Sequence, residues 1–400
     1  MNETTIKIGI LPNKYLNENG TFNKDEAIKL SGKIAGVCYD KEGFSHLENE
    51  PIEKTMRRVD MTLNNGHHSV YDHILINFNL QNVPKILAMI LNNEKQYTTS
   101  EKSARYTPVV RNDNSIITDE EERLYNKWIN IFKLQIKSKY GNIYNDSKIQ
   151  KLAQENARYL VTVFMPTQMI YSTTLRQINY LASWMLEYIE NADMNNIFEK
   201  KLVLSMKELL DNLNDLNVLE EGLMKNEKYR KLSLFGKNLD KKVEYFGDVY
   251  STTYKGSFAQ LAQAHRHRTI DYQMEFLDEK EYFIPPIILE DKMLVDEWLG
   301  DMQLVKNVTP QGELVRINEM GKYEDFILKC KERLCTAAQL EIMYQSRDSL
   351  LKYKEGLEKN NNPLKDDIVK YTKGARCTFP DFICTSDCNF KEGKILTRKI

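Results

Sequence analysis

The sequence predicts an α/β (α+β) protein made of two tandem repeats, each a small sheet flanked by long helices. The chain has 400 residues, which is more than one compact core usually serves, so two domains are expected. Alternating apolar residues predict short strands, and apolar residues at i, i+3, i+4 and i+7 predict helices. A strand, a helix and a polar helix end occur in this order twice, which indicates an internal duplication.

In the first half we predict strands at residues 5–11 and 74–80. We predict helices at residues 25–40, 51–66 and 84–95. The run ILINFNL at 74–80 alternates with a period of two, which is typical of a half-buried strand. Val83, Ile86, Leu87 and Ile90 then follow the helical spacing, and Pro84 opens that helix. Long amphipathic helices are predicted at 125–140 and 148–165, with more helix from Thr174 to about Leu213.

The second half repeats part of this plan. Residues 245–254 read as a strand, and the following helix has apolar spacing from Phe258 to His265 and ends in Arg266-His267-Arg268. Setting Asn93 against Arg266 gives an offset of 173 (266 minus 93), and the preceding strands then align without a gap. The predicted linker covers about 213–231. The predicted boundaries are 1–220 and 221–360 for the repeats, and 361–400 for a cysteine-containing tail.

Charge and composition narrow the class of protein. Lys+Arg 56 against Asp+Glu 57 gives a formal net charge of -1, so we expect no nucleic-acid partner and only local anion sites. The N-terminus lacks a basic region followed by an apolar one, and no window approaches about 18 apolar residues, so we expect a cytoplasmic protein with no membrane partner. Six cysteines in a chain of this length are too unevenly spaced for a disulfide scaffold, which indicates reduced thiols.

Two short motifs complement each other across the halves. The second half has Arg266-His267-Arg268, and the seven residues 269–275 that follow lead to Phe276. The first half has Asn93-Glu94-Lys95 in place of the triplet, yet Glu101, Ser103, Arg105 and Tyr106 follow in SEKSARYTP. Together they resemble the flavin-dependent thymidylate synthase family, in which an Arg-His-Arg triplet closes a helix and precedes Glu-x-Ser-x-Arg-Tyr. The motif is split between the two halves here.

Further segments resemble the same family. HHSVYDH matches its His-x-Thr/Ser-x-x-Glu-His element with His67, Ser69, Asp72 and His73, and has Asp where Glu is usual. Residues 155–176 match its two arginine segments with Arg158 and Arg176, although Thr174 replaces an Asn. RLCTAAQLEI matches its Arg followed six residues later by Gln-x-Glu-Ile, which places Arg333, whereas the first-half equivalent is Met185.

The resemblance implies reductive methylation of dUMP at C5, with methylenetetrahydrofolate and NADPH as cosubstrates and FAD as cofactor. It assigns dUMP binding to Gln263, Arg266, Glu101, Ser103, Arg105, Arg158 and Arg333. It assigns flavin binding to His67, Ser69, Asp72, Arg176, Arg266, His267 and Arg268. Arg333 and Ser103 are the expected catalytic residues, and the expected assembly is a homodimer that mimics the family tetramer, with one composite site per chain.

The chemistry of these residue types suits such ligands. Arg266 and Arg105 are the phosphate candidates, because planar guanidinium forks match phosphate oxygens. Gln263, Arg266 and His267 would share one helix face and line a pocket. A guanidinium beside the N1/O2 edge of the pyrimidine would stabilise the charge that develops there, and Arg333 is the candidate. The protein would otherwise contribute positioning and electrostatics.

Each motif also has a structural alternative. An Arg-His-Arg at a helix C-terminus is a favourable solvated end. Ser103 can be a cap, and Arg158 and Arg176 can be plain surface residues on charged helices. His67, His68 and His73 can form a metal cluster, although no carboxylate shell accompanies them.

The tail adds a separate motif. Cys377, Cys384 and Cys388 lie within twelve residues, and Cys330 or Cys335 would supply a fourth ligand for tetrahedral zinc. The spacing lacks paired Cys-x2-Cys, so unliganded thiols are the alternative.

Two other functions stay open. Asp271, Tyr272 and Phe276 depart from the family near its base-reading loop, which allows another pyrimidine nucleotide or transfer of a hydroxymethyl group. A non-catalytic nucleotide- or flavin-binding homologue is the third class. Residues missing from one half are mostly present in the other, and this favours a working composite site.

Overall fold

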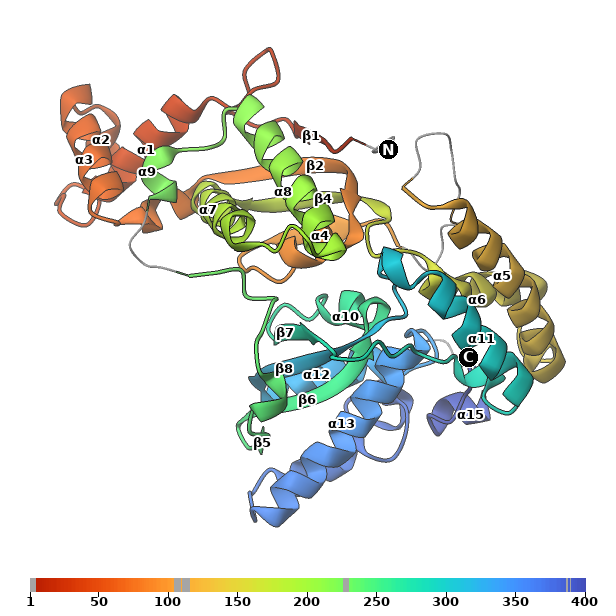
Figure 1. Ribbon diagram of the computed structural model, residues 1–400. Coiled ribbons are helices and arrows are strands. Elements are labelled where there is room, and N and C mark those ends of the chain that lie inside the picture. The colour runs from red at the N-terminus through yellow and green to blue at the C-terminus, as the bar shows by residue number, and fades with distance from the viewer. Residues whose placement is uncertain (1–4, 104–108, 110–115, 226–229, 386–387, 389) are drawn as a thin grey trace. The chain divides into compact units, whose positions relative to one another are not determined.

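The computed structural model describes residues 5–103, 109, 116–225, 230–385, 388 and 390–400 (Figure 1). The chain forms two compact units, one of residues 1–102 and 166–232, the other of residues 103–165 and 233–400. The predicted boundaries at 220 and 360 follow the sequence repeats and stay a prediction. The compact units divide the chain differently, because residues 103–165 pack with the second half.

Each unit contains a four-stranded antiparallel sheet. The first sheet has the order β1-β2-β4-β3, with bounds Lys7–Ile10, Leu75–Pro84, Pro166–Thr174 and Thr98–Glu101. The second has the order β5-β6-β8-β7, with bounds Tyr245–Phe246, Val249–Ser257, Leu314–Lys322 and Asp271–Phe276. The predicted small sheets with long helices are therefore confirmed, and both sheets share one strand order.

The pairing register also corresponds. Thr98 pairs with Ser172 in the first sheet, and Asp271 pairs with Met320 in the second. The offset is 173 between the edge strands (271 minus 98) and 148 between the central strands (320 minus 172). We interpret this correspondence as the result of an internal duplication.

One detail of the predicted alignment is wrong. The strands do not align without a gap, because β2 contains a bulge between Gln81 and Val83. The extra residue, Asn82, has a left-handed φ of 59°, a conformation that asparagine tolerates better than most residues. Beyond the bulge, Pro84 pairs with Pro166 as Ser257 pairs with Leu314, at the same two offsets.

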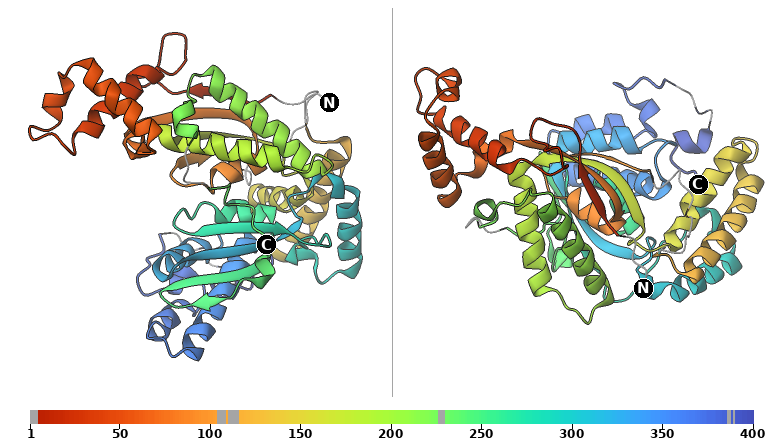
Figure 2. Two further views of the ribbon diagram at one scale, coloured as in Figure 1. Left: turned by 60° about the vertical axis from the view of Figure 1, so that its left-hand side comes forward. Right: turned by 90° about the horizontal axis from the view of Figure 1, so that it is seen from above.

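The helices of the first unit cover its sheet and extend beyond it. They are α1 (Lys24–Gly36), α2 (Phe44–Glu48), α3 (Ile52–Asn64), the 3-10 helix η1 (His68–His73), α4 (Lys85–Leu91), α7 (Leu175–Asn191), α8 (Ile197–Asp215) and α9 (Glu221–Met224). Figure 2 shows α7 and α8 side by side along the sheet. The helical stretch predicted from Thr174 is divided, because the side chain of Asn196 accepts from the amides of Phe198 and Glu199 and so starts a new helix.

The second unit has more helix. Its helices are α5 (Asp119–Tyr140), α6 (Asp146–Ala157), η2 (Arg158–Leu160), η3 (Leu239–Lys241), α10 (Phe258–Ala264), η4 (Pro286–Ile288), α11 (Lys292–Leu304), η5 (Lys306–Val308), α12 (Tyr323–Arg333), α13 (Leu340–Lys359), α14 (Lys365–Ile368), η6 (Val369–Tyr371), η7 (Arg376–Thr378) and α15 (Lys391–Lys394). The helix predicted for 148–165 ends early. Thr162 and Val163 instead bond the backbone of Val308 and Thr309, so tertiary pairing overrides the helical pattern.

Aromatic residues of α5 and α11 form the centre of a large apolar core. Trp128 meets Trp298 edge to face at 4.8 Å between centroids, and Phe132 lies 5.5 Å from Trp298. The indole of Trp128 donates to Asp301, which also pairs with Lys127. This core explains why residues 103–165 belong to the second unit. Among the described residues, no helix has both the length and the hydropathy that crossing a bilayer requires.

Candidate active site

Helix α10 begins at a buried cap. The Ser257 hydroxyl accepts from the amide of Gln260, and the amide and hydroxyl of Ser257 donate to Glu341 at 2.8 and 2.5 Å. Tyr159 donates to the same carboxylate at 2.9 Å. Burial raises the pKa of Glu341, and the hydrogen bonds act against this rise. The start of α10, and with it the position of Gln263, is therefore fixed by three elements.

The Arg-His-Arg triplet follows α10 in a turn. The helix ends at Ala264, and the amide of His267 donates to the carbonyl of Ala264 at 2.9 Å. The predicted helix face shared by Gln263, Arg266 and His267 is therefore wrong, because the tight turn redirects the chain after Ala264. Arg266 and Arg268 are exposed on either side of a buried His267.

Arg333, the last residue of α12, binds His267. Its Nε donates to Nε2 of His267 at 2.7 Å, and its Nη2 donates to the carbonyl of Gln263 at 3.3 Å. The imidazole is 6% exposed. Burial, with the charges of Arg333 and Lys329, lowers the pKa of His267 to about 2. His267 is thus neutral, and it orients the guanidinium that the sequence assigned to the pyrimidine.

A buried ion pair also lies between α12 and β8. Lys329 and Glu319 are both fully buried and lie 2.6 Å apart. Tyr250 and Tyr254 donate to Glu319 at 2.7 and 2.9 Å, so the carboxylate is satisfied. Lys329 lies 5.9 Å over the ring of Tyr272.

Sequence reasoning missed this pair. The only signal was a carboxylate, Glu319, on the same face of β8 as the buried residues Val315 and Ile317. Tyr272, one of the residues that departs from the family pattern, is buried beside Lys329 and His265. It therefore packs inside its unit, whereas Asp271 is exposed.

In the first unit, two of the predicted flavin residues, Asp72 and Arg176, pair with each other. Arg176 pairs with Asp72 at 2.5 Å, and Thr174, the cap of α7, donates to the same carboxylate at 2.7 Å. The guanidinium lies 5.6 Å from the ring of Tyr180. Thr174 thus performs a capping role where the family has Asn. Arg176 is half-buried and held in place, which argues against a plain surface role.

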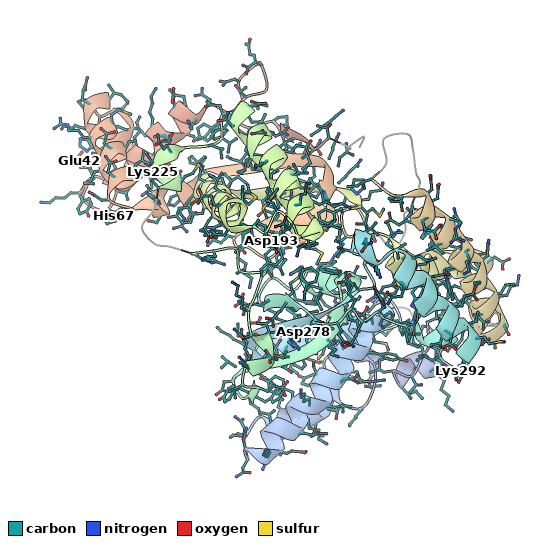
Figure 3. The ribbon with its side chains drawn as sticks, in the orientation of Figure 1. Glu42, His67, Asp193, Lys225, Asp278 and Lys292 are labelled. Carbon is teal, nitrogen blue, oxygen red and sulfur yellow. The ribbon has the colours of Figure 1, made fainter. Side chains whose placement is uncertain are left out.

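The histidines of this segment lie in different environments. His67 (labelled in Figure 3), His73 and Ser69 are exposed. His68 is buried and contacts the Tyr180 hydroxyl at 3.0 Å and the Leu63 carbonyl at 3.1 Å. In the described part of the chain, no three His, Cys, Asp or Glu residues stand in a metal-binding arrangement.

These residues fit an anionic cofactor. The Nε of Arg176 is buried and has no hydrogen-bond partner among the described residues, so a further acceptor there would satisfy it. His67 and Ser69 present exposed polar side chains that can donate to phosphate oxygens. Their assignment to FAD stays a prediction.

The loop after β3 carries the remaining first-half candidates. Glu101 pairs with Lys85 at 2.5 Å, and its side chain is 5% exposed. Ser103 is half-buried. Arg105 and Tyr106 lie outside the described residues. Glu101 therefore anchors the start of this loop to α4.

The corresponding second-half positions are apolar. Phe258 and Phe276 stand where the first half has Lys85 and Ser103, at the offset of 173. Their rings pack at 5.8 Å between centroids. This pair offers no hydrogen-bonding group of the kind that Ser103 provides.

In the predicted alignment, the first-half position that corresponds to His267 carries a glutamate. Glu94 occupies that position and is fully buried, and it pairs with Arg230 at 2.8 Å. The guanidinium of Arg230 lies 4.7 Å from the ring of Trp184. The predicted linker therefore supplies a cation to the position equivalent to His267.

Arg158 follows α6 and is 4% exposed. Its side chain bonds to Tyr125, and burial lowers its pKa. The surface alternative is therefore wrong for Arg158. Its assignment to dUMP stays a prediction.

The tail cysteines line one pocket with a cysteine from the main body of the unit. The pocket has a volume of about 340 Å³, and its lining includes Cys335, Cys377, Cys384 and Cys388. Burial raises the pKa of Cys377, and the nearby thiols of Cys384 and Cys388 act in the same direction. Cys330 is instead buried in α12, where burial raises its pKa to about 12.

A family model matches part of the first half of the chain. Residues 22–198 match the model of a family described as thymidylate synthase complementing protein, Thy1. No curated protein matches the chain.

Two solved structures show weak similarity. One is a UMP/dUMP methylase, PolB, from Streptomyces cacaoi bound with 5-Br dUMP, with 14% identity, coverage of 45% of this chain and 78% of that one, and a TM-score of 0.29. The other is thymidylate synthase X (ThyX) from Helicobacter pylori with FAD and dUMP, with 17% identity, coverage of 55% and 100%, and a TM-score of 0.32. The family match covers residues 22–198, which is less than half of the chain, and this region is similar to the thymidylate synthase complementing protein (Thy1) family.

Proposed function

We propose that this protein methylates C5 of dUMP in a flavin-dependent reaction, with methylenetetrahydrofolate as one-carbon donor and NADPH as reductant. The observation that carries this proposal is the division of residues between equivalent positions. The first half keeps Ser103 where the second has Phe276, and the second keeps His267 where the first has Glu94. The Thy1 match over residues 22–198 supports the same function.

FAD, when bound, would supply the redox chemistry and carry the one-carbon unit. The chain's own residues would bind and orient it. Arg176 presents a guanidinium that Asp72 holds in place, and its unpartnered Nε can donate to a phosphate oxygen. His67 and Ser69 are exposed beside that pair along the chain, and Arg268 would add a second cation.

The nucleotide would be held by charge and by one oriented guanidinium. Arg266 is exposed and suits a phosphate, and Arg105 belongs to the same prediction. Arg333 would stabilise negative charge at the N1/O2 edge of the pyrimidine. Because the neutral His267 accepts from Arg333 Nε, the plane of the guanidinium is set before the substrate binds.

We further propose one active site per chain, with residues contributed by both sequence halves, in a cytoplasmic homodimer. Under this proposal, the apolar pair of Phe258 and Phe276 prevents a second site from forming at the position that corresponds to the Ser103 loop. The ion pair of Glu94 and Arg230 does the same at the first-half position that corresponds to the Arg266-His267-Arg268 triplet.

Release of tritium from C5-labelled dUMP tests the reaction. With FAD, methylenetetrahydrofolate and NADPH present, wild-type protein should release tritium and form dTMP, whose mass distinguishes a methyl from a hydroxymethyl product. Arg333→Ala should slow release by about 10²–10³-fold. Arg123→Ala, which changes an exposed arginine paired with Glu120, should not slow it. Flavin binding without tritium release from any pyrimidine nucleotide would favour a non-catalytic homologue.

A further inference from the structure

Four cysteines from separate segments meet at one pocket of the second unit. Cys335 lies between α12 and α13, Cys377 lies in η7, and Cys384 and Cys388 follow in the tail. The 340 Å³ pocket is also lined by Arg376 and Lys394. The first and last of these thiols are 53 positions apart in sequence (388 minus 335), but they line one pocket.

The backbone brings these segments together. The amide of Cys335 donates to the carbonyl of Arg333 at 2.8 Å, and the amide of Arg376 donates to the carbonyl of Leu334 at 2.7 Å. The Arg376 guanidinium also donates to the carbonyl of Lys331 at 3.1 Å. The tail residue that precedes Cys377 therefore caps the last turn of α12.

A glycine permits the close approach on another side of the pocket. A Cβ at Gly393 would lie 2.3 Å from Cγ2 of Thr336, the residue after Cys335. The loop and the tail are therefore packed too closely for a side chain at this position.

We propose that Cys335, Cys377, Cys384 and Cys388 bind one Zn²⁺ as thiolates. Four cysteine sulfurs are a common ligand set for structural zinc, and Zn²⁺ imposes no geometry from its d electrons, so ligands from irregular loops suit it. In the described residues the thiols do not yet stand in a metal-binding arrangement. Zinc binding would therefore require the four sulfurs to come closer together than they stand here.

The charges and protons of this step balance. Four thiols release four protons to solvent, four Zn–S bonds form, and no electron is transferred. The resulting group carries two net negative charges, which the two cationic residues of the lining, Arg376 and Lys394, can offset.

A cross-link of this kind would stabilise the tail. After α13, the described residues of the tail form only short helices, the longest with four residues. Helices of this length gain little stability from their own hydrogen bonds. A metal that joins the tail to the Cys335 loop would stabilise both, in the way that small domains with little core rely on metals.

Metal analysis of the full-length protein tests the proposal. Protein stripped of metal with a chelator under reducing conditions should take up about one Zn²⁺ per chain, measured by elemental analysis after gel filtration. Cys384→Ser should reduce the zinc content at least about tenfold. Cys384→His should retain zinc, because Cys₃His is also a zinc ligand set. Cys38→Ser, an exposed cysteine of the other unit, is the matched control.

Three results would overturn the proposal. One is wild-type protein that takes up no zinc under reducing conditions. Another is iron with a visible cluster spectrum in place of zinc. The third is an equal loss of zinc in Cys38→Ser and Cys384→Ser. None of these readouts uses enzymatic activity, so the zinc site stands or falls separately from the proposed reaction.

Discussion

Arg333 Nε donates a hydrogen bond to His267 Nε2 at 2.7 Å. Because the Nε of arginine only donates, the imidazole proton must lie on Nδ1, which faces Glu332 at 3.7 Å. The pair therefore consists of a permanent cation and a neutral acceptor. This arrangement leads to a prediction about acid stability.

The free energy of unfolding should fall as the pH is lowered, partly because of His267. Its pKa in the folded protein is lowered from 6.5 to about 2, mainly by burial. The unfolded chain therefore binds one more proton below pH 6.5, so the contribution of His267 is complete above that pH and is lost as pH falls. In His267→Gln, which keeps an acceptor for Arg333, the unfolding free energy should depend less steeply on pH, by up to about 1.4 kcal/mol per pH unit. Urea unfolding at several pH values between 7.5 and 5 measures this.

His46 provides the control with the opposite sign. Its hydrogen bond to Asp40 raises its pKa, so its contribution is present below pH 6.5 and is lost as pH rises through the raised pKa. His46→Gln should therefore not reduce the loss of stability in acid. Identical pH profiles for wild type and His267→Gln would show that His267 is protonated in the folded protein.

Arg333→Ala should lower turnover more than nucleotide affinity. We expect kcat to fall by about 10²–10³-fold, since the proposed partner of the guanidinium is charge that develops in the transition state. The Kd for dUMP should change by less than about tenfold. Steady-state kinetics and calorimetric titration separate the two effects. Met185→Arg, at the equivalent first-half position, should restore nothing, and normal turnover in Arg333→Ala would show that α12 does not serve the reaction.

Arg230→Ala should destabilise the first unit without affecting catalysis. Glu94 is fully buried, so loss of the positive charge of Arg230 should be costly, although Arg230 itself is 48% exposed. We expect a loss of about 1–3 kcal/mol in unfolding free energy. The kcat of the folded fraction should stay within about twofold of wild type. A loss of turnover with unchanged stability would instead place Glu94 and Arg230 in a working site.

The protein should bind one FAD and one dUMP per chain. Each half lacks residues that the other keeps, so the sequence contains no second complete set. Flavin absorbance against protein mass, with calorimetric titration of dUMP, gives both ratios. Two flavins per chain would overturn the division of residues, as would activity that survives Ser103→Ala combined with Arg266→Ala.

Flavin affinity should depend on both halves. His67→Ala, Arg176→Ala and Arg268→Ala should each weaken FAD binding by about 1–3 kcal/mol, as expected for lost charged hydrogen bonds. Arg57→Ala, an exposed arginine of α3, should leave it unchanged. Quenching of flavin fluorescence during titration measures the affinity. Protein that takes up no flavin would contradict the assignment.

Much of the fold could be predicted because its local patterns agree with its tertiary structure. The ILINFNL strand and the helix from 125 to 140 have clear periodicities. The helix lies within α5, and β2 contains all of ILINFNL except Ile74. The bulge at Asn82 could not be predicted, because a single inserted residue leaves the alternation on each side intact. Nor could the end of α6, after which the Thr162 hydroxyl bonds the Val308 carbonyl and the Val163 amide bonds the Thr309 carbonyl.

The site was predictable in its residues and less so in their contacts. Short motifs identified His267 and Arg333, but they assigned the two residues to different ligands, and the structure joins them. Contacts of this kind depend on where α12 ends, which the motif does not encode. The pair of Lys329 and Glu319 was missed because charged residues are expected at surfaces unless a partner is known.

The chain passes between its two compact units three times, after residues 102, 165 and 232. During synthesis, β4 leaves the ribosome only after α5 and α6, although β4 is the strand that pairs with both β2 and β3. The first sheet therefore lacks its centre until residue 174 has been made, and α5 and α6 wait still longer for α11. A protein fragment that ends between these points would have unpaired strand edges and an uncovered aromatic face on α5. Neither unit can therefore be produced from one uninterrupted segment of the coding sequence.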